Sequence, residues 1–79
     1  MIQEIIDQYP DETFLKADGY DEAIIGVDET KMRLVYSVGK VLEILQRDMN
    51  QEEAIEFFEF NVSGAYMGER TPIWCHDEF

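Results

Sequence analysis

The sequence predicts an α+β domain in which two main helices pack on one face of a small antiparallel sheet of three to four strands. Two β-rich runs, residues 23–27 and 32–36, are separated by four polar residues that fit a hairpin loop. Two amphipathic runs with capping residues follow at 37–47 and 50–66, as is typical of helices. Because 46% of the residues are hydrophobic, they can form one small core, which predicts a single domain over residues 1–79.

A short N-terminal helix is expected first, because apolar residues recur with helical spacing over residues 2–9. Pro10 disfavours helix at the residue before it, so this helix needs docking to be stable. Residues 13–17 are expected to be extended and to end in a turn at Asp18-Gly19, a dipeptide that accepts positive φ.

The two β-rich runs differ in pattern. The run 23–27 is almost wholly apolar and is therefore expected to be the more buried strand. Gly26 within it predicts a bulge or a close approach by a helix. A further strand is expected at 71–75, with Pro72 marking its start or a sheet edge. The tail, residues 76–79, is expected to be mobile.

Capping residues define the two main helices. Ser37 is expected to cap the first, whose predicted core face consists of Val38, Val41, Leu42 and Leu45. Asn50 and Glu53 form a capping-box variant that opens the longest helix, over residues 51–66. Its predicted core stripe is Ala54, Ile55, Phe58, Val62 and Ala65. The sequence leaves open whether Phe57, Phe60 and Asn61, which flank this stripe, belong to the core or to an interface.

The charge balance excludes several partner classes. With 18 Asp and Glu against 6 Lys and Arg, the net charge is −12, so we expect neither direct nucleic-acid binding nor binding to an anionic membrane. The one Cys allows no internal disulfide, which favours a reducing cytosolic compartment. The first eight residues lack the features of a signal peptide or membrane span.

No motif predicts catalysis or metal binding. Cys75 and His76 are adjacent and would face opposite sides of a strand, and no second Cys or His exists to complete a zinc site. Residues 18–22 lack the ligand spacing of a calcium loop. The carboxylate pairs are numerous, and none is singled out for acid–base work. We therefore expect no enzyme, no metal and no cofactor.

An acidic helix face is the strongest functional signal in the sequence. Along a helix, Glu52 to Glu56 rise about 6 Å and Glu56 to Glu59 about 4.5 Å, the same order as the roughly 3.4 Å between phosphates of one DNA strand. The alternative is a solvated face without function. A net charge beyond the magnitude of about 2–8 that solubility needs favours phosphate mimicry. The candidate contact residues are Glu52, Glu56, Glu59 and Phe60, with Asp18, Asp21 and Glu22 as a second patch.

Two stretches, DEAIIGV at 21–27 and EAIEFFEFNVSGAYMGERTPI at 53–73, resemble a family of small acidic proteins found in bacteriophages and related mobile DNA. The resemblance covers roughly residues 18–74. It implies a phage-borne accessory gene that is expressed in the host bacterial cytoplasm, and it implies no functional residue. By analogy with other small phage proteins, it also implies binding and disabling of a host protein.

The leading hypothesis is a non-enzymatic protein that binds a basic, nucleic-acid-binding surface of a host defence or transcription protein. One alternative is an oligomeric protein that sequesters a small molecule or nucleotide. That protein would use the aromatic side of Phe57, Phe60 and Tyr66 with cations from Arg33, Lys40 and Arg47. Another alternative is a virion accessory protein. The sequence leaves open whether the chain forms a homodimer.

Overall fold

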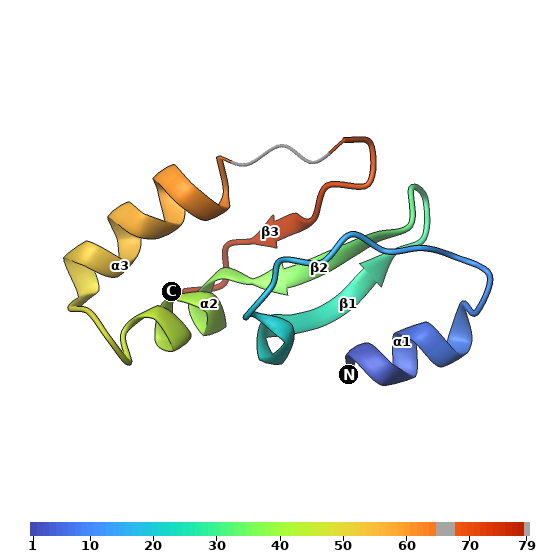
Figure 1. Ribbon diagram of the computed structural model, residues 1–79, viewed down its shortest axis with the longest axis horizontal. Coiled ribbons are helices and arrows are strands. Elements are labelled where there is room, and N and C mark those ends of the chain that lie inside the picture. Colours follow the sequence, from blue (N-terminus) through green and yellow to red (C-terminus); the bar gives the residue numbers. More distant parts are fainter. Residues whose placement is uncertain (65–67, 79) are drawn as a thin grey trace.

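The chain forms a three-stranded sheet with helices at both of its ends (Figure 1). The computed structural model describes residues 1–64 and 68–78. The helices are α1 (Ile2–Gln8), α2 (Val38–Leu45) and α3 (Gln51–Phe57), and the strands are β1 (Ile24–Asp28), β2 (Arg33–Ser37) and β3 (Ile73–Cys75). A 3-10 turn, η1 (Asp21–Ala23), precedes β1, and a π-helix, η2 (Phe58–Val62), continues α3. The predicted α+β class, with two main helices and a short N-terminal one, is confirmed.

The sheet is mixed, which corrects the expected antiparallel arrangement. Its order is β1-β2-β3; β1 and β2 are antiparallel, whereas β3 runs parallel to β2, with Val35 opposite Ile73 and Ser37 opposite Cys75. The cause is the connection: α2 and α3 lie between β2 and β3 and carry the chain back toward the start of β2. A crossover of this length joins parallel strands.

The hairpin lies one residue later than predicted. Met32 has a φ of 53°, a left-handed loop conformation, so β2 begins at Arg33. The register shifts between Ile24 and Gly26, so the pairing of the two strands is irregular at the glycine where a bulge or a close approach by a helix was expected. The expectation that β1 would be the more buried strand is wrong, because β2 is central and fully buries Leu34 and Tyr36.

The core contains residues from every helix and from the first two strands: Ile5, Ala23, Ile24, Leu34, Tyr36, Val38, Val41, Leu45, Ala54, Phe58 and Val62. Two core predictions are wrong, since Leu42 is half-buried and Ile55 is 38% exposed. The buried row of α3 and η2 runs through positions 54, 58 and 62, in steps of four. In a regular α-helix this row would drift by about 40° per step.

The π-helix explains how this row stays on one face. Ser63 N–H donates to the Phe58 carbonyl at 2.8 Å, an i→i+5 bond that widens the turn. The helix predicted over residues 51–66 is confirmed as far as Val62. Ala65 and Tyr66, which were assigned to its core stripe and to the aromatic side, lie outside the described residues.

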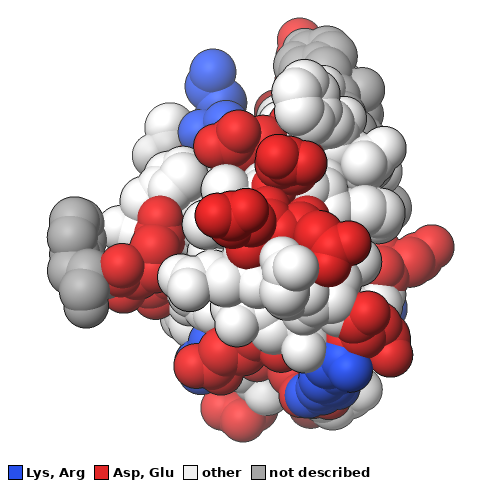
Figure 2. Space-filling model, turned by 90° about the vertical axis from the view of Figure 1, so that its left-hand side faces the viewer, with Lys and Arg blue, Asp and Glu red and all other residues white. Residues whose placement is uncertain are grey.

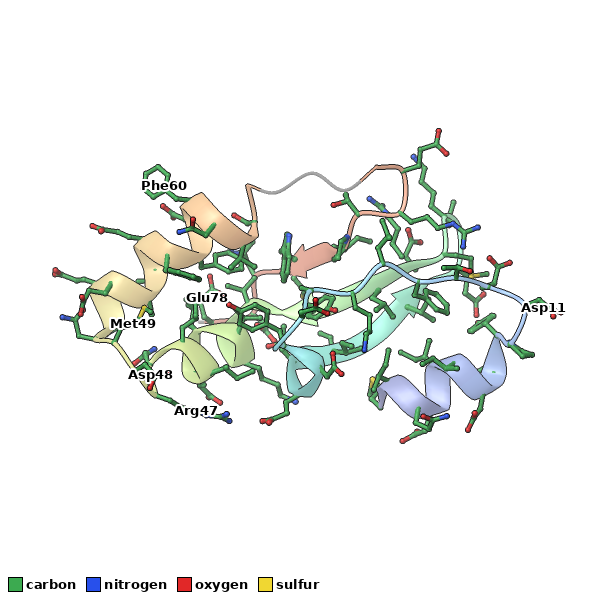
Figure 3. The ribbon with its side chains drawn as sticks, viewed as in Figure 1. Asp11, Arg47, Asp48, Met49, Phe60 and Glu78 are labelled. Atoms are coloured by element: carbon green, nitrogen blue, oxygen red, sulfur yellow. The ribbon has the colours of Figure 1, made fainter. Side chains whose placement is uncertain are left out.

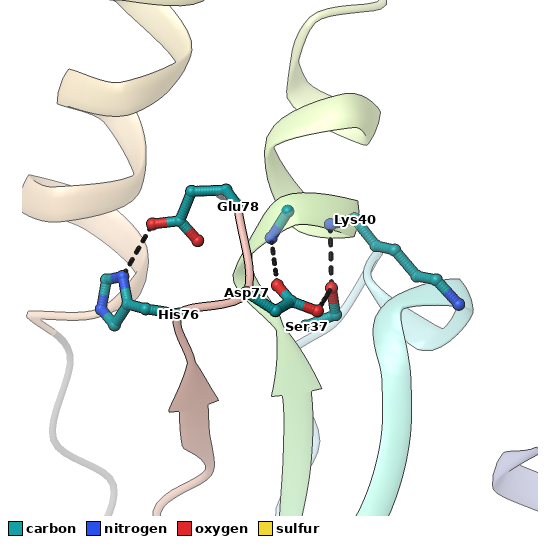
Figure 4. A network of polar contacts seen from close by, with 6 residues as sticks. Ser37, Lys40, His76, Asp77 and Glu78 are labelled. Atoms are coloured by element: carbon teal, nitrogen blue, oxygen red, sulfur yellow. Dashed lines mark hydrogen bonds and ion pairs between the residues drawn. The ribbon is translucent and has the colours of Figure 1, made fainter.

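Residues 76–78 of the tail are docked, which corrects the expectation that they are mobile; Phe79, the last residue of that expectation, lies outside the described residues. Asp77 accepts hydrogen bonds through Oδ1 from Gly39 N–H at 2.9 Å and through Oδ2 from Ser37 Oγ at 2.7 Å (Figure 4). Ser37 Oγ also accepts from Lys40 N–H, as expected of the helix cap. The bonds from Ser37 and Gly39 hold the pKa of Asp77 below its usual value. A Cβ on Gly39 would lie only 3.2 Å from Asp77 Oδ1, so glycine permits this approach.

The segment between α1 and η1 is irregular, and hydrogen bonds and an ion pair connect it to strand β2 and to the loop before β3. Ala17 N–H donates to the buried Tyr36 hydroxyl at 2.8 Å. Arg70 reaches across from the loop before β3 to Glu12 and to the Thr13 carbonyl. The predicted turn at Asp18-Gly19 is confirmed, with a φ of 93° at Gly19. These contacts fix the position of the turn that carries the second acidic patch.

Candidate partner-binding surface

The acidic face of α3 and η2 is open to solvent. Its position follows from the capping box, in which Asn50 Oδ1 accepts from Glu53 N–H at 2.9 Å and Glu53 accepts from Asn50 N–H at 3.2 Å. Within residues 1–64 and 68–78, Glu52, Glu56 and Glu59 are exposed and form no ion pair. Figure 2 views this end of the molecule and shows acidic side chains grouped at its centre, with basic ones toward the edges. The three carboxylates are therefore available to an external cation.

Exposed apolar side chains lie beside these carboxylates. Phe60 is 80% exposed and Phe57 39% exposed, and Figure 3 shows Phe60 pointing away from the body of the protein. A shallow groove of about 340 Å³ adjoins them, lined by Met49, Glu53, Glu56, Phe57, Phe60 and Asn61. The sequence left open whether Phe57, Phe60 and Asn61 belong to the core. The structure places all three outside the core, as exposed residues.

The second predicted patch is largely neutralised. Asp21 pairs with Lys16 at 3.4 Å, and Glu22 pairs with Arg47 at 3.1 Å. Of the three acids, Asp18 alone has no ion pair with any residue that the structure describes. This patch therefore presents one free carboxylate in place of three.

The cations assigned to the sequestering alternative line two different hollows. Lys40 and Arg47 line a cavity of about 260 Å³ beside α2. Arg33 lines a larger groove of about 580 Å³, together with Lys31 and Arg70, between the hairpin loop and the loop before β3. Arg33 is paired with Asp28 at 3.2 Å, and Arg70 with Glu12 at 2.9 Å. Sequence reasoning missed this groove because it is assembled from two loops that lie far apart in the chain.

The remaining candidate residues have simple surroundings. Cys75 is a half-buried free thiol on the edge strand β3, and His76 Nδ1 lies 3.0 Å from Glu78 Oε1 (Figure 4). Among the described residues, no three His, Cys, Asp or Glu side chains are grouped to hold a metal ion. No helix in that same part of the chain is long and apolar enough to cross a membrane.

Comparisons with protein-family models, with curated proteins and with solved structures gave no match for this chain.

Proposed function

We propose that the chain is a non-enzymatic interaction protein that binds a basic, nucleic-acid-binding surface of another protein. The observation that supports this most directly is the exposed Phe60 beside Glu52, Glu56 and Glu59, carboxylates without an ion-pair partner in the described parts of the chain. A charged rim around an apolar anchor is a common arrangement at protein interfaces.

The charges and the anchor have different roles in this proposal. An exposed ion pair contributes only about 0.2–1 kcal/mol, whereas full burial of a Phe side chain contributes roughly 1.5–3 kcal/mol. Affinity then comes mainly from Phe60. The carboxylates and the net charge of −12 accelerate encounter with a basic surface and make association sensitive to salt.

The biological setting is also a proposal. We infer from the phage-family resemblance that the partner is a host defence or transcription protein and that the chain inhibits it in the bacterial cytoplasm. The sequestering alternative has weaker support, because Arg33 lines one hollow while Lys40 and Arg47 line another. No observation specifically favours a virion accessory role. A homodimer is tested by light scattering after size exclusion.

The decisive experiment is capture of partners from bacterial lysate at low and high salt with wild type and with Glu52→Lys/Glu56→Lys/Glu59→Lys. Each reversal adds two charge units, so the triple variant has a net charge of −6 in place of −12. Like charges then face each other, and we expect association with the captured partner to slow by orders of magnitude. Phe60→Ala should instead speed dissociation.

The matched control carries the same change in charge elsewhere. Asp7, Asp11 and Glu69 are exposed, and Figure 3 places Asp11 at the end of the molecule opposite Phe60. Reversing these three acids to Lys should leave specific binding largely intact. If both triple variants lose binding equally, only net charge matters and the α3 surface is not the contact.

A further inference from the structure

Another hollow lies between α3 and the turn that carries Asp18. It has a volume of about 340 Å³ and combines aromatic with polar walls. The residues that matter for its chemistry are Lys16, Asp18, Tyr20, Phe57, Asn61 and Trp74. They come from three segments of the chain: the turn after the irregular segment, the end of α3 with η2, and strand β3. The volume is at the lower end of the range for small-ligand sites.

Three aromatic rings form the walls of this hollow, and Trp74 among them is held by ring contacts. Trp74 packs against the buried Tyr36, with ring centroids 5.0 Å apart, and forms a T-shaped pair with Phe58, with ring centroids 5.5 Å apart. Tyr20 is half-buried, and burial raises its pKa. Phe57 adds a third ring from the helix. Aromatic faces attract cations through their negative quadrupole, and guanidinium groups stack well on them.

The polar walls favour the same kind of ligand. Asp18 is exposed and has no ion pair with a described residue. Lys16 also lines the hollow, but its ammonium group lies 3.4 Å from Asp21, which offsets its charge. Asn61 is exposed at the rim and offers an amide oxygen as an acceptor. The lining thus presents one uncompensated carboxylate beside three aromatic rings.

The hollow is also continuous with the proposed contact surface. Phe57 and Asn61 line both this hollow and the groove beside Phe60, whose other walls include Glu53 and Glu56. A basic partner that approaches the acidic face of α3 would therefore present its side chains at the mouth of the hollow.

We propose that the hollow formed by Asp18, Tyr20, Phe57, Asn61 and Trp74 binds the guanidinium group of an arginine side chain. This deepens the proposed function by naming the partner's anchoring residue. The selectivity of the hollow for arginine can nevertheless be measured without the partner. Arginine fits better than lysine because its planar, weakly hydrated cation can stack on rings while donating to a carboxylate.

The test uses the single Trp of the chain as its reporter. Titration with N-acetyl-arginine amide, at constant ionic strength, should shift the Trp74 indole N–H resonance and saturate. N-acetyl-norleucine amide has a similar length and no charge, and should bind at least about fivefold more weakly. Tetramethylammonium serves as the probe for a free quaternary ammonium ligand.

Two variants and one control sharpen the result. Asp18→Asn and Phe57→Leu each remove one contact from an exposed position and should weaken arginine-amide binding about threefold to tenfold. Asp11→Asn makes the same chemical change as Asp18→Asn on an exposed carboxylate outside the hollow, and should leave binding unchanged.

Several results would overturn the assignment. These are the absence of a saturable shift, equal binding of the arginine and norleucine amides, wild-type affinity in Asp18→Asn, or tighter binding of tetramethylammonium than of the arginine amide. Failure of the wider proposal is distinguishable, because selective arginine binding would then persist although no partner is captured or the Glu52/Glu56/Glu59 reversal has no effect.

Discussion

Phe58 and Phe60 provide a matched test of which helix face is buried. Phe58 is 3% exposed and packs in a T-shaped arrangement with Trp74, with ring centroids 5.5 Å apart, whereas Phe60 is 80% exposed. Near-complete burial places Phe58→Ala in the range of about 3–5 kcal/mol. Part of this cost is the lost aromatic contact, typically about 0.5–1.5 kcal/mol. Phe60→Ala deletes the same atoms, but from a side chain that is exposed to solvent, so it should lower the free energy of unfolding by less than about 0.5 kcal/mol.

The loss at Phe58 is large relative to the whole domain. At about 0.05–0.15 kcal/mol per residue, a chain of this length has a free energy of unfolding of roughly 4–12 kcal/mol. Phe58→Ala should therefore lower the melting temperature by well over about 10 °C or unfold the protein. Phe58→Leu, which keeps most of the apolar volume, provides a milder variant that is expected to fold.

Urea unfolding followed by circular dichroism and Trp74 fluorescence measures these differences, provided the transition is two-state. Equal stability of the Phe58→Ala and Phe60→Ala variants, or a larger loss for Phe60→Ala, would refute the reasoning. The helix would then be rotated, and the assignment of Glu56 and Glu59 to the exposed face would fail with it.

Two further predictions concern the helix caps. Asn50→Ala removes the acceptor for Glu53 N–H and should destabilise the fold by about 1 kcal/mol, measured by urea unfolding; an unchanged midpoint would contradict the role of the capping box. Asp77→Asn should lower the melting temperature at neutral pH. The pKa of Asp77 is lowered in the folded state, so its contribution is present above the usual carboxyl range and is lost as the pH falls through the lowered pKa. The melting temperatures of wild type and Asp77→Asn, measured as a function of pH, should therefore converge in acid. A difference that stays constant down to pH values below that pKa would contradict this.

Local signals made much of the fold predictable. Ser37 and Asn50 could be predicted as helix caps from the sequence because the N–H group that each side chain bonds lies only three residues away. The Asp18-Gly19 turn follows from the conformational freedom of glycine, because Gly19 has a φ of 93°. In each case the determining contact or conformation lies within a few residues, where spacing in the sequence directly reports spacing in the structure.

Most of the errors arose where contacts join distant segments, and one arose from an irregular helix. Nothing near Asp77 indicates that it bonds Ser37, 40 residues earlier. A regular helical wheel assigned Ile55 to the core because it does not include the π-helix that begins at Phe58. The acidic face was accessible to sequence reasoning because all its members share one helix. The aromatic hollow was not, because Tyr20, Phe57 and Trp74 come together only after folding.

The parallel pairing of β3 with β2 also determines when the chain can finish folding. During synthesis the β1–β2 hairpin emerges first, and a two-stranded hairpin alone is marginally stable in water. The β2 edge stays unpaired until Ile73–Cys75 appear, and at about 5–20 residues per second that interval lasts seconds. Contacts of such long sequence separation form slowly. A chain interrupted before residue 73 is thus an open-edged, aggregation-prone intermediate, not a smaller version of the domain.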